Sequence, residues 1–363
     1  AVPQATGIAI LGDVFVSALK AIAPLLVFFL VISSLCNAGK SHGGVIKTVI
    51  ILYMFSTVLA AVIAVFASMA FPVKMTLANA ATDTSAPQGI VEVLNNLLLN
   101  VVANPVSSLV NANYVGILMW AVLLGLAFRV ADKMTKKVLA DVADGISMVV
   151  TWIINLAPFG IFGLVFNTVS TNGLDIFTTY GKLLILLVGC MLFIYFVTNP
   201  LLVYWCIRQN PYPLIFHCLK RSALTAFFTR SSAANIPVNM KVCEEMGLDR
   251  DTYSVTIPLG ATINMDGAAI TITVMTMATA FTLGIHVDIP TAIILSLLAA
   301  LSACGASGVA GGSLLLIPMA CSLFGISDDI SMQVVAVGFI IGVVQDSVET
   351  ALNSSSDLLL SAS

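Results

Sequence analysis

The sequence predicts an all-α protein that crosses a membrane several times. Hydrophobic residues make up 59% of the 363 residues, the mean hydropathy is +1.05, and only 9% of residues are charged. Soluble domains carry about 25% charged residues, so a soluble protein with one ordinary core is excluded. A net charge of -3 without a basic patch excludes a nucleic-acid-binding role. Since a bilayer core requires roughly 20 apolar residues per helix, the length allows on the order of ten full or partial crossings.

Apolar runs separated by short polar breaks define the expected helices of the first two thirds of the chain. The third run is too long for one crossing and is interrupted near Asn104 and Asn111. After Pro211 the apolar segments become shorter and carry Ser, Gly, Asn and Asp at membrane depth. The five expected runs are 11–36, 45–71, 90–130, 146–169 and 183–207.

The distribution of Lys and Arg predicts the orientation. Loops near Thr82, Thr171 and Asp288 hold almost no basic residues, whereas the loops that alternate with them hold most of these residues. By the positive-inside rule the basic loops face the cytoplasm. These basic loops are 37–47, 129–137, 208–221 and 241–250.

Cysteine and histidine give no sign of a metal centre or a disulfide framework. The seven cysteines form no CxxC pair and lie mostly in apolar runs, and the three histidines are not spaced as metal ligands. We therefore expect no zinc site and no bound cofactor.

The last apolar stretch, 332–360, carries a polar stripe. A charge at bilayer depth costs at least about 2.5–3.5 kcal/mol, so such residues indicate function. At about 100° per residue the stripe covers an arc of about 100° and predicts a polar ladder facing the protein interior. The alternative is a frayed helix end in water, which accounts for Asp357 better than for Asp346. The stripe consists of Asp346, Glu349, Thr350, Asn353 and Asp357.

A second unusual segment runs from Pro258 to Gly267. Asn264 and Asp266 are two residues apart, so on a regular helix they point about 200° apart. They can converge on one ion only if the helix unwinds there, which the flanking Pro and Gly favour. Freed carbonyls together with Asn and Asp oxygens suit Na+. A polar kink that bridges two helices is the alternative.

Two short segments, 228–237 and 304–313, have the composition of re-entrant hairpins. Each lies within an apolar stretch and is too rich in Ser or Gly for an ordinary span. The first follows a basic loop and the second an uncharged one, so they enter from opposite faces. Such a pair indicates an inverted repeat with a binding site at the midplane, where free N–H groups attract carboxylates. Packing of small residues between ordinary helices is the alternative.

Together these residues resemble the dicarboxylate/amino acid:cation symporter family, which includes glutamate and neutral amino acid transporters. The resemblance covers the chain from Leu11 onward. Its most specific part is the order of an Arg-Ser-Ser hairpin, an Asn-Met-Asp-Gly break and an Asp-x6-Asn-x3-Asp helix. The branch that looks closest is the bacterial serine/threonine:sodium symporters, by segments 229–238 and 345–357.

The resemblance implies a glutamate-transporter-like fold with two re-entrant helical hairpins, a broken helix and inverted repeats. Members form homotrimers of elevator transporters with eight spans, of which we expect the first to be missing here. The implied scaffold comprises 1–38 and the trimerisation helices 82–170. The implied transport domain comprises 44–71 and 172–363, with hairpins around 213–247 and 289–325.

The family's binding residues carry over position by position. The substrate amino group would meet Asp346, and its carboxylate would meet Asn353, Ser232 and N–H groups of the hairpin tips. The rest of the implied substrate site is Arg230, Ser231, Val309, Gly312, Ser313, Glu349 and Thr350.

The first implied sodium site is Gly260, Asn264, Asn353 and Asp357. The second is Thr262, Met265, Ala303, Cys304 and Ala306. The third is Tyr53, Ser56, Thr57, Asn264 and Asp266. By position alone, the Ser56 and Thr57 hydroxyls could instead bond their own helix carbonyls.

Departures from the family pattern predict the specificity. Members that bind acidic substrates carry Arg where this chain has Glu349, and Thr where it has Ala268. A buried Glu repels a side-chain carboxylate, so glutamate and aspartate are poor candidates. We expect Arg230 to pair with Glu349, and Thr350 to bond a hydroxyl side chain.

The resulting hypothesis is sodium-coupled import of L-serine and L-threonine through a bacterial inner (plasma) membrane, with membrane lipid around the protein. One alternative is proton-coupled transport of small amino acids or dicarboxylates through Asp346 and Glu349. A hydrolase using Ser231 or Ser307 is remote, because no GxSxG elbow or membrane-depth His accompanies them. A channel is a further alternative.

Overall fold

The computed structural model describes residues 6–37, 44–77, 99, 102–172, 176–304, 306 and 311–363. All regular secondary structure within these ranges is helical. Six of the described helices or joined helix pairs are long and apolar enough to cross a membrane. The prediction of an all-α, multi-spanning membrane protein is therefore confirmed.

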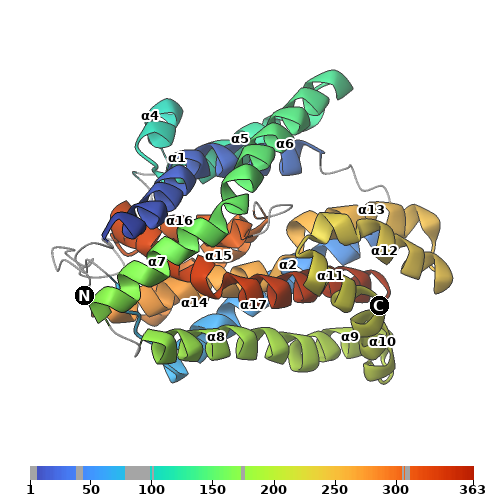
Figure 1. Ribbon diagram of the computed structural model, residues 1–363. Coiled ribbons are helices and arrows are strands. Elements are labelled where there is room, and N and C mark those ends of the chain that lie inside the picture. The colour runs from blue at the N-terminus through green and yellow to red at the C-terminus, as the bar shows by residue number, and fades with distance from the viewer. Residues whose placement is uncertain are drawn as a thin grey trace.

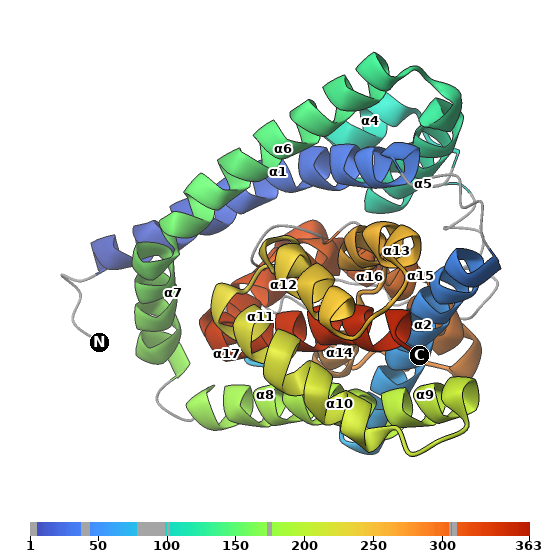
Figure 2. The same ribbon diagram turned by 90° about the vertical axis from the view of Figure 1, so that its right-hand side faces the viewer.

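One group of helices is built around α1 (Thr6–Asn37). It packs against α5 (Tyr114–Ala127), α6 (Lys133–Asn155) and α7 (Ala157–Asn172), and the short α4 (Pro105–Val110) packs on α5. In Figure 2, α1 and α6 run side by side above α14 and α17. The contact between α1 and α7 is close, since a Cβ added at Gly163 would lie 2.8 Å from the Ile8 carbonyl oxygen. Small residues permit this approach of two helix backbones in a membrane.

A second, larger group surrounds α14 (Asp266–Thr282) and α17 (Asp328–Ser361). α14 packs against α2 (Gly44–Ala70), α8 (Ile176–Phe193) and α17, and it is buried from Asp266 to Ala280. α8 continues through a π turn (Ile194–Thr198) into α9 (Asn199–Ile207). The helix α13 (Arg250–Ile263) precedes α14 and completes this group.

Two helix–turn–helix units lie toward opposite ends of α17 (Figure 1). The first rises through α10 (Tyr212–Cys218), a π turn (Leu219–Ala223) and α11 (Leu224–Thr229), and returns as α12 (Ser232–Glu245). The second rises as α15 (Ile289–Ala303) and returns through a 3-10 turn (Gly312–Leu316) and α16 (Ile317–Ser322). These are the two re-entrant segments that the sequence predicts, although 305 and 307–310 lie outside the described residues.

The expected span 146–169 is wrong in its limits. The chain there forms two helices, because α6 already begins at Lys133 and ends at Asn155, before Pro158. Asp132 caps α6 by accepting the Thr135 N–H at 2.7 Å, and this bond lowers the pKa of Asp132. The first turns of α6 are charged, so hydropathy alone places its start too late.

Candidate substrate and cation sites

The central break separates α13 from α14 at Asn264 and Met265. The N–H of Asn264 still bonds the Gly260 carbonyl at 2.9 Å, and the next helix begins at Asp266. The predicted unwinding is therefore confirmed. The two polar side chains beside the break face different neighbours. Asn264 lies toward the end of α17, and Asp266 lies toward α2.

A buried cluster of oxygens lies between the break and α17. The Asn264 amide Nδ2 donates to Asp357 Oδ1 at 2.9 Å and is 2.8 Å from Ser356 Oγ. Among the described residues, neither Asn264 Oδ1 nor Asp357 Oδ2 has a hydrogen-bond partner, although both atoms are buried. An acceptor left unpaired in the interior costs about 1–3 kcal/mol, and more when it is charged. The donor set of amide and carboxylate oxygens fits a hard cation.

Asp357 is 1% exposed, so the alternative of a frayed, wetted helix end is wrong. The cluster is also closely packed. A Cβ added at Gly260 would lie 2.9 Å from Asp357 Oδ1 and from the Tyr53 hydroxyl. That hydroxyl donates toward the Asp357 carbonyl at 3.0 Å and lies 2.7 Å from Ser361 Oγ.

A second cluster joins Asp266 to α2. Ser56 Oγ donates to Asp266 Oδ2 at 2.8 Å, and Thr57 Oγ1 lies 3.2 Å from Asp266 Oδ1. The Thr57 hydroxyl also donates to the Tyr53 carbonyl of its own helix at 3.0 Å. Among the described residues, the Ser56 hydroxyl donates to Asp266 and to no carbonyl of its own helix. The interpretation that both hydroxyls serve only their own helix therefore fails for Ser56. Asn199, on α9, is 3.5 Å from Ser56 Oγ and is a neighbour that the sequence reasoning missed.

The second hairpin lies beside the break. Cys304 Sγ is 3.7 Å from the Ile263 carbonyl, and the Ala306 N–H bonds the Ala303 carbonyl at 2.9 Å. The Thr262 hydroxyl donates to the Leu259 carbonyl at 2.7 Å. These contacts bring the end of α15 to the last turn of α13.

Both hairpin tips meet at Asp346. Arg230 Nε donates to Asp346 Oδ2 at 2.7 Å, and the Gly311 N–H donates to Oδ1 at 3.1 Å. Arg230 has a left-handed backbone (φ 51°) that ends α11 and starts the turn. A cavity of about 580 Å³ adjoins this carboxylate, and the junction of α6 and α7 at Asn155 and Pro158 forms its other wall.

The expected pairing of Arg230 with Glu349 is wrong. Glu349 Oε2 accepts from Thr271 Oγ1 at 2.7 Å, from Ser313 Oγ at 2.9 Å and from Gln345 Nε2. These three neutral donors come from α14, the second hairpin and α17, and they satisfy the carboxylate while Arg230 pairs one turn earlier. Thr271 and Gln345 were not predicted as site residues, although Gln345 lies one turn before Glu349 on the same face.

The sequence matches the sodium:dicarboxylate symporter family over residues 3–363. The chain belongs to this family. It is 60% identical over 361 residues to the serine/threonine transporter SstT of Bifidobacterium adolescentis, an alignment that covers 99% of this chain and 84% of the relative. The family resemblance is thereby confirmed, and the hydrolase interpretation is wrong, because the chain belongs to a family of transporters and not of enzymes.

Two of the other residues predicted for the substrate site of this symporter, Asn353 and Ser231, make hydrogen bonds within the protein. Asn353 Oδ1 accepts the Gly267 N–H at 2.7 Å and its Nδ2 is 3.4 Å from Met265 Sδ, so it supports the start of α14. Ser231 caps α12 by accepting the Ala234 N–H at 3.2 Å. Ser232 and Thr350 are buried, and Val309 lies outside the described residues. Their roles toward substrate and sodium stay predictions.

Proposed function

We propose that this symporter imports L-serine and L-threonine together with Na+ across the plasma membrane of a bacterium. The observation that carries the proposal is a pair of buried oxygens, Asn264 Oδ1 at the break and Asp357 Oδ2 on α17, which have no hydrogen-bond partner among the described residues. The same helix α17 presents Asp346 to both hairpin tips. The serine/threonine transporter named above supports the choice of substrate.

Sodium binding orders the break in this proposal. A cation between Asn264 Oδ1 and Asp357 Oδ2 satisfies both oxygens and compensates the buried Asp357 charge. Asp266, with Ser56 and Thr57, offers a second oxygen cluster, and the carbonyls near Met265 and Cys304 offer a third. Each bound ion links the break between α13 and α14 to another helix, so occupancy of the cation sites is coupled to the conformation of the break.

The substrate ammonium takes the place of the Arg230 guanidinium at Asp346. The guanidinium holds Asp346 Oδ2 at 2.7 Å in this structure, and either cation keeps the buried carboxylate compensated. The substrate carboxylate then faces the Asn353 amide, the Ser232 hydroxyl and N–H groups of the tips. Closure of the second hairpin excludes water from the site.

Glu349 selects against acidic side chains. Its carboxylate is held by Thr271, Ser313 and Gln345, so it cannot turn away from a neighbouring negative charge without losing three hydrogen bonds. A second carboxylate in this buried position costs several kcal/mol. A small hydroxyl side chain adds no charge and can bond Thr350.

Translocation follows an elevator movement of one helix group along the other. The group around α1, α5, α6 and α7 is the scaffold, and the group around α14 and α17 with the two hairpins is the transport domain. The cavity between Asp346 and Pro158 lies at the boundary of these groups, where a sliding contact has to open. We further propose that the scaffold forms a homotrimer.

A ligand screen tests this function. The purified protein is heated with each standard amino acid in NaCl and in choline chloride, and the unfolding temperature is recorded. Binding to the folded state raises this temperature, so serine and threonine are expected to raise it in NaCl only. Equal stabilisation in choline chloride contradicts sodium coupling, and stabilisation that depends on pH alone favours the proton-coupled alternative.

A further inference from the structure

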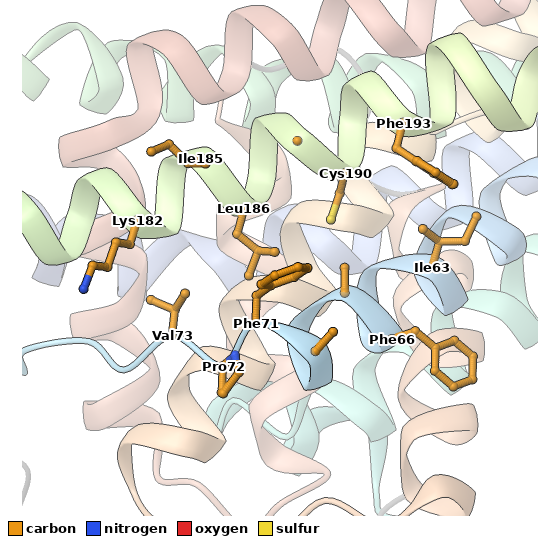
Figure 3. A pocket seen from close by; sticks show the side chains of 13 residues that line it. Ile63, Phe66, Phe71, Pro72, Val73, Lys182, Ile185, Leu186, Cys190 and Phe193 are labelled. Carbon is orange, nitrogen blue, oxygen red and sulfur yellow. The ribbon is translucent and has the colours of Figure 1, made fainter.

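An apolar groove lies between α2 and α8, away from the cation and substrate clusters. Its volume is about 840 Å³. α8 contributes a stripe of residues at the three- and four-residue spacing of one helix face. α2 contributes Phe66, and Phe71 follows directly after the end of α2 (Figure 3). The stripe on α8 is Lys182, Ile185, Leu186, Gly189, Cys190 and Phe193.

The length of the groove matches one leaflet of a bilayer. Lys182 and Phe193 are eleven positions apart, which corresponds to about 16 Å along a helix. The hydrocarbon core is about 30 Å thick, so each leaflet contributes about half of that. One extended acyl chain therefore spans the groove from end to end.

The groove has a cationic end. Lys182 lies at one end of it beside Val73, and Ile63, Phe66 and Phe193 lie toward the other (Figure 3). Within the described part of the chain, Lys182 is exposed and no ion pair or hydrogen bond engages its ammonium group. Lys74 follows Val73 directly and is also exposed.

Lysine is unexpected at this end of the groove. The loops after α2 and before α8 belong to the side that the positive-inside rule assigns to the exterior, where basic residues are scarce. Lys74 and Lys182 are exceptions: Lys182 lines this end of the groove, and Lys74 directly follows Val73, which also lines it. A lysine stem lies along apolar surface while its ammonium group reaches the headgroup level, where it attracts a phosphate.

We propose that the groove binds an anionic glycerophospholipid of the outer leaflet. One acyl chain lies along the α8 stripe between Ile185 and Phe193, and the headgroup phosphate pairs with Lys182, with Lys74 adding to the local positive charge. The lipid thereby bridges α2, which carries Ser56 and Thr57, to α8. The site is separate from the substrate cavity, since no residue lines both.

Native mass spectrometry of the purified protein tests the site. The protein is released from nanodiscs that contain equal amounts of phosphatidylglycerol, phosphatidylcholine and phosphatidylethanolamine, and the retained lipids are counted. We expect retention of phosphatidylglycerol over the other two lipids. Lys182→Ala is expected to weaken that preference about fivefold, the effect of one lysine at an anionic surface.

A second variant fills the groove. A Cβ added at Gly189 meets no atom within 4 Å, so a side chain can start there without a clash. Gly189→Trp directs an indole into the groove and is expected to remove the retained lipid. Gly181→Trp is the matched control, because Gly181 lies on the same helix, is equally unobstructed and does not line the groove. Should Gly189→Trp fail to fold, Ala67→Leu narrows the groove from the α2 side.

The results of these experiments distinguish a bound anionic lipid from other occupants of the groove. Equal retention of phosphatidylcholine, or retention unchanged by both Lys182→Ala and Gly189→Trp, overturns the proposal. Loss of the phosphatidylglycerol signal on addition of millimolar inorganic phosphate also overturns it, since the acyl chain then contributes nothing. A dimer that dissociates with Gly189→Trp assigns the groove to a second copy of the chain and contradicts lipid binding.

Discussion

Arg230 on the first hairpin and Asp346 on α17 form an ion pair, with 2.7 Å between Nε and Oδ2, at the point where the second hairpin also contacts Asp346. The proposed amino subsite therefore holds a protein cation in this structure. Asp346 is buried, so removal of its cation leaves an uncompensated charge, whereas a second cation in the same place compensates it. The exchange of guanidinium for substrate ammonium at Asp346 is the step on which the proposed binding depends.

Asp346→Asn is expected to abolish high-affinity serine binding, because an amide cannot compensate an ammonium group. A hydrogen bond to a charged group contributes about 1.5–3 kcal/mol, so the dissociation constant is expected to rise by at least about tenfold. Isothermal titration with serine in NaCl measures it. Asp144→Asn, on the exposed face of α6, is the matched control. A folded Asp346→Asn protein with the original affinity refutes the role of Asp346.

Glu349→Arg is expected to admit aspartate, because it exchanges the repelling charge for an attracting one. Thr271, Ser313 and Gln345 lose their common acceptor in this variant, so we expect a lower unfolding temperature as well. Glu349→Gln keeps an acceptor oxygen without the charge and serves as the control for charge alone. Competition of aspartate against labelled serine is the measurement, and no aspartate binding by a folded Glu349→Arg protein counts against the specificity argument.

Asp266→Ala is expected to raise the sodium concentration for half-maximal binding by about tenfold or more. The change removes the carboxylate that accepts from Ser56 and Thr57, and with it one cluster of cation-binding oxygens. Titration of sodium at fixed serine measures the effect, and Asp251→Ala on the exposed first turn of α13 is the control. An unchanged sodium dependence removes Asp266 from the coupling mechanism.

Gly312→Ala is expected to prevent proper closure of the second hairpin. The added Cβ would lie 2.6 Å from the Ala306 carbonyl oxygen, a backbone atom that cannot move aside as a side chain does. Serine affinity is expected to fall by about tenfold. Gly145→Ala, where the new methyl group meets no atom within 4 Å, should leave affinity unchanged. Equal affinities of the two variants contradict the close approach of residues 306 and 312.

Much of the fold could be predicted because a membrane-spanning helix needs a long apolar run, in which polar residues stand out. The polar stripe on α17, the break at Asn264 and the two hairpins each place costly polar groups at membrane depth, and each is found in the structure. The start of α6 could not be read from hydropathy, because Asp132 and a charged first turn begin that helix.

Which site residues contact each other was harder to predict than which residues belong to the site. Asp346 and Glu349 are three residues apart on one face, and sequence alone does not say which of them Arg230 reaches. That choice depends on the left-handed turn at Arg230 and on Thr271, a residue 78 positions from Glu349 in the chain. Contacts of this kind are set by tertiary packing, as is the approach of Asn199 to Ser56.

Serine uptake into liposomes that contain only the purified protein tests the central claim most directly. Because a neutral amino acid moves with Na+, net positive charge enters, and an inside-negative potential of 100 mV should increase accumulation by about 50-fold for each net charge. We predict accumulation of serine that requires external Na+ and grows with the inside-negative potential. Uptake that is unchanged when choline replaces Na+ would contradict the account.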